Sequence, residues 1–238
     1  MKAMILAAGF GRRMLPLTER LPKPMLTVQE KPLIAYHVSR LVAAGVRELV
    51  INVGHLGHII VDYLGDGEAF GANIQYSCEP PDAPLETAGG VMKALPLLGS
   101  EPFLLVNGDL WTDFPFEQLK ALRTDALFHG AVILPPDHHP KGDFCLSDDG
   151  RLTEREGVRV VFSGISRIDP GLFRLPVAQD KEKLRSWIYA AMAKGQASGA
   201  LFSGEWVDVG TPQRLQELDL AVAARARANE GVSPDGVA

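Results

Sequence analysis

The sequence predicts an α/β fold, with an open and mostly parallel sheet covered by helices on both faces. Short apolar runs rich in β-branched residues alternate with stretches of helical periodicity over the first half of the chain. Two of these runs, 3–8 and 103–106, lead directly into glycine-containing polar segments, as strands do where open α/β sheets bind ligands. With 238 residues, of which 46% are hydrophobic and 22% charged, the chain can form such a core without disulfides.

The elements of the first half follow from local pattern. After the strand at 3–8, a helix is expected over 31–44, because Leu33, Val38 and Leu41 recur at helical spacing and Gly45 ends the pattern. Residues 48–53 are apolar and β-branched and predict a strand. A short helix over 57–64, a strand over 74–78, a helix over 87–98 and the wholly apolar strand 103–106 continue the alternation.

The second half gives a weaker pattern. A helix is expected over 116–123 and a strand over 126–134, followed by a long polar loop over 135–159. His138 and His139 in that loop have no third ligand at zinc spacing, so a solvated loop is favoured over a metal site. A strand over 160–168, a helix over 181–193, strands over 200–203 and 206–209, and a final helix with Pro212 in its first turn complete the chain.

Composition restricts the function classes. The net charge of −5 gives no general attraction for nucleic acid, so any phosphate must be bound by local cations. Cys78 and Cys145 are far apart and are expected to be reduced thiols in or near the core. The sequence enters a strand at once, with no signal peptide or membrane span, so we expect a cytoplasmic protein. We find no repeat or Ser/Gly linker and expect one domain over 1–230, divided near residue 125, and a flexible tail over 231–238.

The loop after the first strand, residues 6–18 with Pro22-Lys23-Pro24, carries the strongest signal for chemistry. Its two glycines permit a tight backbone whose N–H groups can surround an anion, and its arginines and Lys23 add positive charge. A plain tight turn is one alternative. A dinucleotide-binding turn is another, but Met14 stands where a third small residue is needed and Pro16 obstructs the helix. A Walker loop is excluded, because no Gly-Lys-Ser/Thr follows.

The whole string, Leu-Ala-Ala-Gly-x-Gly-x-Arg-Met-x-Pro-Leu-Thr followed by Pro-Lys-Pro, resembles the signature of the sugar-1-phosphate nucleotidylyltransferases. Three further segments, 84–90, 106–109 and 206–212, extend the resemblance over about residues 2–225. It implies a Rossmann-like three-layer α/β/α fold of the glycosyltransferase-A-like kind, with 1–125 as the nucleotide-binding half and 126–230 as the sugar-binding half. It also implies a reaction that joins a nucleoside triphosphate to a sugar 1-phosphate and releases pyrophosphate, with Mg²⁺ as cofactor.

The resemblance assigns roles to individual positions. The residues implied in nucleotide binding are Ala8, Gly9, Phe10, Gly11, Arg12, Arg13, Lys23, Glu79, Glu86 and Thr87. Those implied in catalysis are Arg13, Lys23, Asp109 and Asp208, with Asp109 and Asp208 as the metal ligands. Those implied in sugar binding are Asn107, Gly142 and Gly164. An arginine fork suits two phosphate oxygens and a lysine suits a point charge, which agrees with the roles of Arg13 and Lys23.

The chain departs from the family pattern at several positions. Glu79 and Glu86 stand where Gln and Gly are usual, and a carboxylate can accept from uracil or guanine, so the base stays open. The family's Glu-Lys-Pro is missing, and Arg155 or Arg159 is the expected substitute for its lysine. The compact form is most similar to members that transfer uridylyl groups to N-acetylmuramate 1-phosphate. Mannose 1-phosphate with GTP, a glucose 1-phosphate, and a nucleotide-sensing regulatory relative remain alternatives. The oligomeric state, monomer or dimer, stays open.

Overall fold

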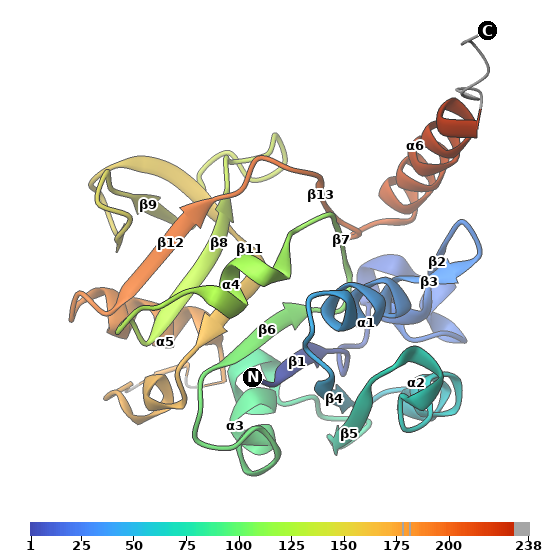
Figure 1. Cartoon of the computed structure of the whole chain (residues 1–238), viewed down its shortest axis with the longest axis horizontal. Coiled ribbons are helices and arrows are strands. Elements are labelled where there is room, and N and C mark those ends of the chain that lie inside the picture. Colours follow the sequence, from blue (N-terminus) through green and yellow to red (C-terminus); the bar gives the residue numbers. More distant parts are fainter. Residues whose placement is uncertain (178, 181, 231–238) are drawn as a thin grey trace, which may run out of the picture.

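The computed structural model describes residues 1–177, 179–180 and 182–230, so the expected flexible tail lies outside the described residues. A large sheet forms the centre of the molecule (Figure 1). Seven of its strands follow the order β5-β4-β1-β6-β11-β8-β12, and β9 and β10 extend it beside β11. Their bounds are β1 (Ala3–Leu6), β4 (Glu48–Val53), β5 (Asn73–Cys78), β6 (Phe103–Asn107), β8 (Phe128–Ile133), β9 (Phe144–Leu146), β10 (Leu152–Thr153), β11 (Val158–Ile168) and β12 (Ala197–Leu201).

The sheet is mixed and mostly parallel, as expected. β1 lies between β4 and β6 and is parallel to both, so Ile5 pairs with Ile51 on one side and Val106 on the other. β11 is antiparallel to β6 and to β8, and β12 is parallel to β8. β6 and β11 therefore join the first half of the chain, blue to green in Figure 1, to the second half.

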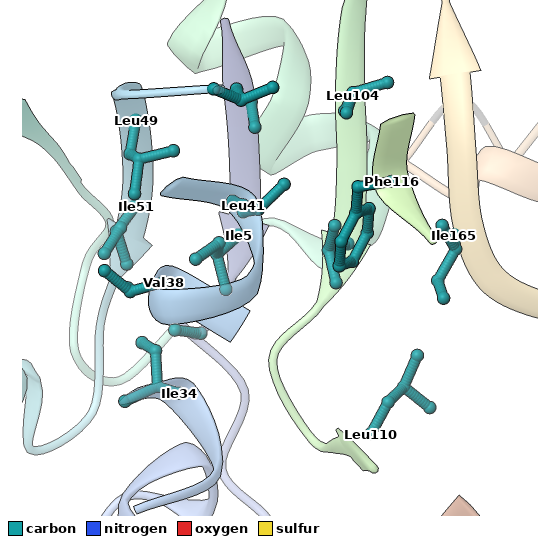
Figure 2. Close-up of a cluster of buried hydrophobic side chains, with 14 of the residues drawn as sticks. Ile5, Ile34, Val38, Leu41, Leu49, Ile51, Leu104, Leu110, Phe116 and Ile165 are labelled. Atoms are coloured by element: carbon teal, nitrogen blue, oxygen red, sulfur yellow. The ribbon is translucent and has the colours of Figure 1, made fainter. Parts of the chain in front are cut away.

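The helices cover both faces of this sheet and make three layers. They are α1 (Leu33–Ala43), α2 (Gly57–Leu64), α3 (Glu86–Leu98), α4 (Phe116–Ala121), α5 (Leu184–Met192) and α6 (Pro212–Glu230). Alternate residues of β1 point to opposite faces, so Ile5 belongs to a core with α1, α2 and α4, whereas Met4 belongs to a core with α3 and α5. Figure 2 shows α1 residues Ile34, Val38 and Leu41 grouped around Ile5 in the first core.

A third, smaller core attaches the last helix. It is formed by Met14, Leu26, Val28, Leu33, Trp111, Val209 and Leu218. Met14 comes from the glycine loop and Leu218 from α6, so the end of the chain packs beside the loop that follows β1. None of the helices in the described residues is both long and apolar enough to cross a bilayer.

The structure corrects several expected elements. The segment 135–159 is not only loop, because β9 and β10 form a hairpin there. Two small sheets were missed: β2 (Thr27–Val28) with β3 (Lys31–Pro32), and β7 (Leu110–Thr112) with β13 (Trp206–Asp208). The strand at 206–209 was expected and matches β13, but its pairing was not, and β2, β3 and β7 are too short to carry a recognisable pattern. α5 begins at Leu184 rather than near 181, and β12 begins at Ala197 rather than near 200. Cys145 is buried as expected, but Cys78 is exposed on the edge strand β5.

Candidate active site

The loop after β1 is held in a compact form by its own backbone. Gly11 has φ +63°, and a Cβ there would lie 2.9 Å from the Cγ2 of Thr18, so both the conformation and the space require glycine. The Thr18 hydroxyl donates to the Gly11 carbonyl at 3.0 Å, and the Met14 N–H donates to the same carbonyl at 2.8 Å. A short 3₁₀ turn, Arg12–Met14, then buries Met14 and leaves both arginines exposed. The loop is thus a fixed backbone frame that presents cations.

This loop forms the wall of a cavity of about 520 Å³. All ten residues expected to bind nucleotide line it: Ala8, Gly9, Phe10, Gly11, Arg12, Arg13, Lys23, Glu79, Glu86 and Thr87. Asn107 and Asp109 line it as well, at the carboxyl end of β6. One opening therefore collects residues that come from well-separated segments of the sequence.

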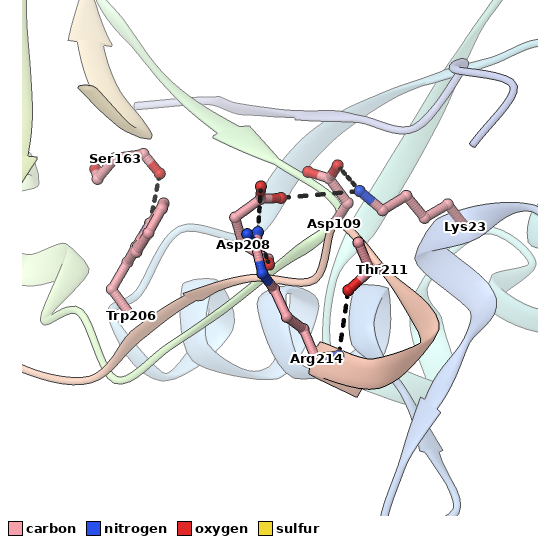
Figure 3. Close-up of polar contacts among 7 residues, drawn as sticks. All are labelled: Lys23, Asp109, Ser163, Trp206, Asp208, Thr211 and Arg214. Atoms are coloured by element: carbon pink, nitrogen blue, oxygen red, sulfur yellow. Dashed lines mark hydrogen bonds and ion pairs between the residues drawn. The ribbon is translucent and has the colours of Figure 1, made fainter. Parts of the chain in front are cut away.

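The Lys23 ammonium faces two aspartates (Figure 3), Asp109, which lines this cavity, and Asp208, which is not in its lining. The ammonium forms an ion pair with Asp109 and lies 3.9 Å from the Oδ1 of Asp208. The Lys23 side chain is only 9% exposed, so Pro22 and Pro24 hold it in a buried position rather than in solvent. The charge of the ammonium offsets the repulsion between the two carboxylates.

The small sheet of β7 and β13 explains how residues so distant in sequence meet. Asp208 pairs with Leu110 in that sheet, and the Val209 N–H donates to the Asp109 carbonyl at 3.3 Å. Arg214, in the first turn of α6, donates to the Oδ2 of Asp208 at 3.4 Å. Trp206 ties β13 to β11 through a 2.8 Å bond from its Nε1 to the Ser163 carbonyl. Arg214 and Trp206 were not identified from the sequence, because their roles depend on this unexpected pairing.

A divalent cation fits this pair of aspartates. Mg²⁺ in proteins is usually bound by one or two carboxylates together with phosphate oxygens and water. No group of three or more His, Cys, Asp or Glu side chains gathers at one point in the part of the chain that the structure describes. Two carboxylates suit a metal ion that substrate oxygens and water would help to hold, rather than a closed structural site.

Glu79 is part of a buried network that the sequence did not reveal. Its Oε1 accepts from the Asn52 amide at 2.7 Å, and its Oε2 accepts from the Leu85 N–H at 2.8 Å. The Asn52 oxygen in turn accepts from the Ala7 N–H at 2.8 Å. Glu79 is 6% exposed, and a Cβ on Gly90 would lie only 2.5 Å from its Oε1. Glu79 thus ties the loop 80–85 to the end of β1, although it also lines the cavity.

Glu86 differs from Glu79, which is buried and hydrogen-bonded. It is exposed at the first position of α3, and its backbone has φ +58°, a left-handed conformation that is costly for any residue but glycine. The family's usual glycine at this position thus matches the geometry, and this chain maintains a strained glutamate instead. A side chain kept at such a cost at the edge of a cavity is a candidate for function.

A second cavity of about 210 Å³ continues from the first. Glu86, Thr87 and Asn107 line both. Its remaining wall comes from the second half of the chain: Asp143, Phe144, Phe162, Lys183, Leu184, Arg185 and Ile188. The carbonyl of Glu182 accepts from the N–H groups of Ala88 and Gly89, at 2.7 and 3.3 Å, so the segment before α5 is bonded to the first turn of α3. The two cavities are therefore parts of one cleft.

The residues expected to bind sugar divide into two groups. Asn107 faces both cavities, whereas Gly142 and Gly164 line neither one within the described residues. Gly164, with φ +84°, leaves room for Asn107, because a Cβ there would lie 2.6 Å from the Asn107 Nδ2. Gly142 precedes Asp143, which does line the second cavity. Both glycines therefore support a neighbour rather than face the opening.

The expected replacements for the missing lysine are not at the cleft. Arg159 donates to the carbonyls of Lys141 and Glu154, at 2.7 and 3.2 Å, which directs it to the β9–β10 hairpin. Arg155 is exposed, and over the described residues neither arginine lines either of these two cavities. The cations that do line the second cavity are Lys183 and Arg185, neither of which was predicted from the sequence.

His37 is an unusual buried group beneath the site. It is 1% exposed, and neither ring nitrogen forms a hydrogen bond of normal geometry within the described residues. Burial, reinforced by the charge of Arg40, lowers the pKa of His37 to about 4, while the Leu110 backbone and the Asp109 carboxylate oppose the shift. The ring is therefore neutral at physiological pH and acts as a core residue.

Comparisons with known proteins identify the family of the chain. A family model described as nucleotidyl transferase matches residues 2–146. An N-acetylmuramate alpha-1-phosphate uridylyltransferase from Neisseria meningitidis serogroup B is 45% identical over 230 residues, which cover 94% of this chain and 99% of that protein. A mannose-1-phosphate guanyltransferase from Gibberella zeae is 33% identical and is matched over 90% of this chain, but over only 62% of its own length.

The fold has a solved counterpart. A structure from Bacillus anthracis, described as a glucose-1-phosphate thymidylyltransferase in complex with a sucrose, superimposes with a TM-score of 0.81. The superposition covers 93% of this chain and 94% of the other at 20% sequence identity. It confirms the Rossmann-like α/β architecture expected from the sequence. Because the family match spans more than half of the chain and the Neisseria relative is matched over nearly its full length, this chain belongs to the nucleotidyl transferase family and is an enzyme of the sugar-1-phosphate nucleotidyltransfer type.

Proposed function

We propose that this enzyme transfers the uridylyl group of UTP to N-acetylmuramate 1-phosphate, giving UDP-N-acetylmuramate and pyrophosphate. The observation that carries the proposal is the single cleft. Its larger cavity is lined by the cationic loop and by Glu86, and its smaller cavity continues from it past Asn107. The 45% identity to the Neisseria uridylyltransferase supports the choice of substrates.

The reaction needs charge neutralisation and alignment rather than a protein nucleophile. An oxygen of the sugar phosphate attacks the α-phosphorus of UTP, and the bond from that phosphorus to the bridging oxygen of the β-phosphate breaks. Arg13 and Lys23 offset the charge of the phosphates, and the Gly9–Arg13 backbone holds them in line with the acceptor. Asp109 and Asp208 would hold Mg²⁺, which would supply Lewis-acid activation of the phosphate oxygens.

Glu86 is the proposed reader of the base. Its carboxylate is exposed in the cavity, whereas both carboxylate oxygens of Glu79 already accept bonds within the protein. A carboxylate can accept from N3–H of uracil, and it can also accept from N1–H and N2–H of guanine. GTP with mannose 1-phosphate is therefore the second candidate, supported by the guanyltransferase relatives.

The test is pyrophosphate release by the purified protein with Mg²⁺, measured for each pairing of UTP, GTP and dTTP with N-acetylmuramate, mannose and glucose 1-phosphates. We expect the largest kcat/KM for UTP with N-acetylmuramate 1-phosphate. A larger value for GTP with mannose 1-phosphate would replace this assignment with the second candidate. Release from no pairing would favour a nucleotide-sensing regulatory protein. The proposed setting is the cytoplasm, in the recycling of cell-wall sugars.

A further inference from the structure

The second cavity is distinguished by two cations that no reaction step uses. Lys183 precedes α5 and Arg185 lies in its first turn, and both line the cavity together with apolar residues. Arg185 pairs with no carboxylate among the described residues, and Lys183 pairs only with Asp180, at 3.3 Å, in an exposed contact of little strength. Two carboxylates, Glu86 and Asp143, line the same cavity, but neither forms an ion pair with Lys183 or Arg185 among the described residues.

Arg185 is held in place rather than free in solvent. Its Nη2 donates to the Tyr189 hydroxyl at 3.0 Å, and its guanidinium lies 5.3 Å from the centre of the Tyr189 ring. The Tyr189 hydroxyl in turn donates to the Asp143 carbonyl at 3.0 Å. A chain of contacts thus fixes the arginine relative to the opposite wall of the cavity, so less side-chain entropy is lost when an anion binds.

The hydrogen bond to Tyr189 and, to a smaller extent, the charge of Asp143 on that wall raise the pKa of Arg185, but Arg185 and Asp143 form no ion pair among the described residues. The Oδ2 of Asp143 accepts from the Phe162 N–H at 3.0 Å, and its Oδ1 faces His139 Nε2 at 3.2 Å. Asp143 is therefore engaged with the second half of the chain. The two cations remain available for an anionic group of the substrate.

The position of this cavity decides which anion it accepts. The phosphate that reacts must lie near Lys23 and Asp109, which line the first cavity but not the second. Asn107, Glu86 and Thr87 stand at the junction between the two. A sugar whose 1-phosphate lies in the first cavity thus extends past Asn107, and a substituent remote from its anomeric carbon reaches the second.

We propose that Lys183 and Arg185 bind a carboxylate carried by the sugar and so select an acidic sugar 1-phosphate over its neutral counterpart. The inference rests on the proposed function. N-acetylmuramate is N-acetylglucosamine with a lactyl ether at O3, so it carries the carboxylate that these cations require. Arginine and lysine bind carboxylates through charge-assisted bonds, which are stronger than neutral ones. The pair is thereby a specificity determinant that acts on binding and not on the transfer step.

The experiment compares two acceptors that differ only in the lactyl group, N-acetylmuramate 1-phosphate and N-acetylglucosamine 1-phosphate, with UTP and Mg²⁺. Variants Lys183→Gln, Arg185→Gln and the double variant remove the charges but keep polar side chains. We expect each single change to raise KM for N-acetylmuramate 1-phosphate about tenfold and the double change on the order of a hundredfold, with little change in kcat. KM for N-acetylglucosamine 1-phosphate should stay constant.

Two controls keep the outcome specific. Arg155→Gln removes an exposed cation of the same half that lines neither cavity in the described structure, and it should leave both KM values unchanged. Arg185→Lys keeps the positive charge, so this variant should retain most of the preference for N-acetylmuramate 1-phosphate over N-acetylglucosamine 1-phosphate. Thermal unfolding of every variant confirms that the fold is retained.

The outcomes separate the inference from the proposed function. A wild-type enzyme that prefers N-acetylglucosamine 1-phosphate, or uses neither acceptor, refutes the proposed substrate and the carboxylate site with it. If the wild type prefers N-acetylmuramate 1-phosphate and the variants keep that preference, only the role of Lys183 and Arg185 is refuted. Equal losses on both acceptors also overturn it, because the cations would then hold the shared phosphate.

Discussion

The two cavities of the cleft are built in contrasting ways. The larger one is formed by loops that follow parallel strands, and its buried polar groups are bonded to one another, as Glu79 is to Asn52 and Lys23 to Asp109. The smaller one is lined by residues of β9, β11 and α5 together with the start of α3, and its cations are exposed. The first is a preorganised frame suited to the phosphates that every member of this reaction class must bind. The second has exposed side chains that can differ between enzymes, as a site that distinguishes one sugar from another requires.

Apart from the two aspartates that Lys23 contacts, the largest effect is expected at Lys23. Lys23→Met removes the ammonium between the two aspartates, and we expect kcat/KM to fall about 10²–10³-fold, the loss typical of one preorganised group at a reacting centre. Steady-state pyrophosphate release measures it. Arg20→Met, an exposed cation outside the lining of the cavity, is the control and should retain near wild-type activity. Equal activities of the two variants would remove Lys23 from the site.

Glu79 tests whether the larger cavity is held by internal bonds. Glu79→Ala leaves the Asn52 amide and the Leu85 N–H without their acceptor, so the free energy of unfolding should fall by roughly 2–3 kcal/mol. Urea denaturation gives the value. Glu86→Ala, at an exposed position, is the matched change and should cost less than about 0.5 kcal/mol. Similar losses for both would contradict the contrast between these two carboxylates.

The buried His37 makes the free energy of unfolding depend on pH. Its pKa is about 4 in the folded protein, against an ordinary value of 6.5, so the unfolded chain binds a proton first and stability falls as the pH drops from 6.5 toward 4. At pH 5 the loss should be about 2 kcal/mol relative to pH 7, from this group alone. His37→Leu should flatten that part of the profile in urea titrations. The exposed His58→Gln should leave its slope unchanged. A His37→Leu profile as steep as that of the wild type would show that His37 is not the cause.

Glu86 is expected to show the smallest change in the free energy of unfolding. Its two variants separate the effect of backbone strain from the effect of the carboxylate on UTP binding. Glu86→Gly relieves a left-handed backbone and should raise the free energy of unfolding by about 1 kcal/mol, whereas Glu86→Ala keeps the strain and should not. Both variants lose the carboxylate, so KM for UTP should rise about fivefold in each, the size of one hydrogen bond. Denaturation and UTP titration measure the two effects. A Glu86→Gly variant that is more stable and equally active would show that the glutamate has no role in base binding.

Sequence pattern predicted best the parts of the cleft that are built from short-range pattern. The glycine loop and the residues at the ends of β1 and β6 were predicted, because glycine, proline and apolar runs determine local backbone and sheet position. All the residues expected to contact nucleotide line one cavity for this reason. The extent of the α/β core followed from the same periodicity.

The parts that could not be predicted depend on pairing between distant segments. The β7–β13 sheet has only three-residue strands, yet it determines which groups surround Asp208. The Glu79–Asn52 bond crosses from the end of β5 to β4, so neither residue alone indicated that Glu79 is buried. Lys183 and Arg185 lie in an amphipathic helix region, where charged residues are ordinary, and only the cavity distinguishes them.

The most direct test of a shared metal site is a double-mutant cycle on Asp109 and Asp208, measured as kcat/KM at saturating Mg²⁺. Because both carboxylates face Lys23 and are proposed to hold one metal ion, Asp109→Asn and Asp208→Asn should each lower kcat/KM by on the order of 10³-fold. The double variant should be little worse than either single variant, since each loss disables the same unit. Asp62→Asn, at an exposed position on α2, should have no effect. Strictly additive losses, or an unimpaired single variant, would contradict a shared role for the two aspartates.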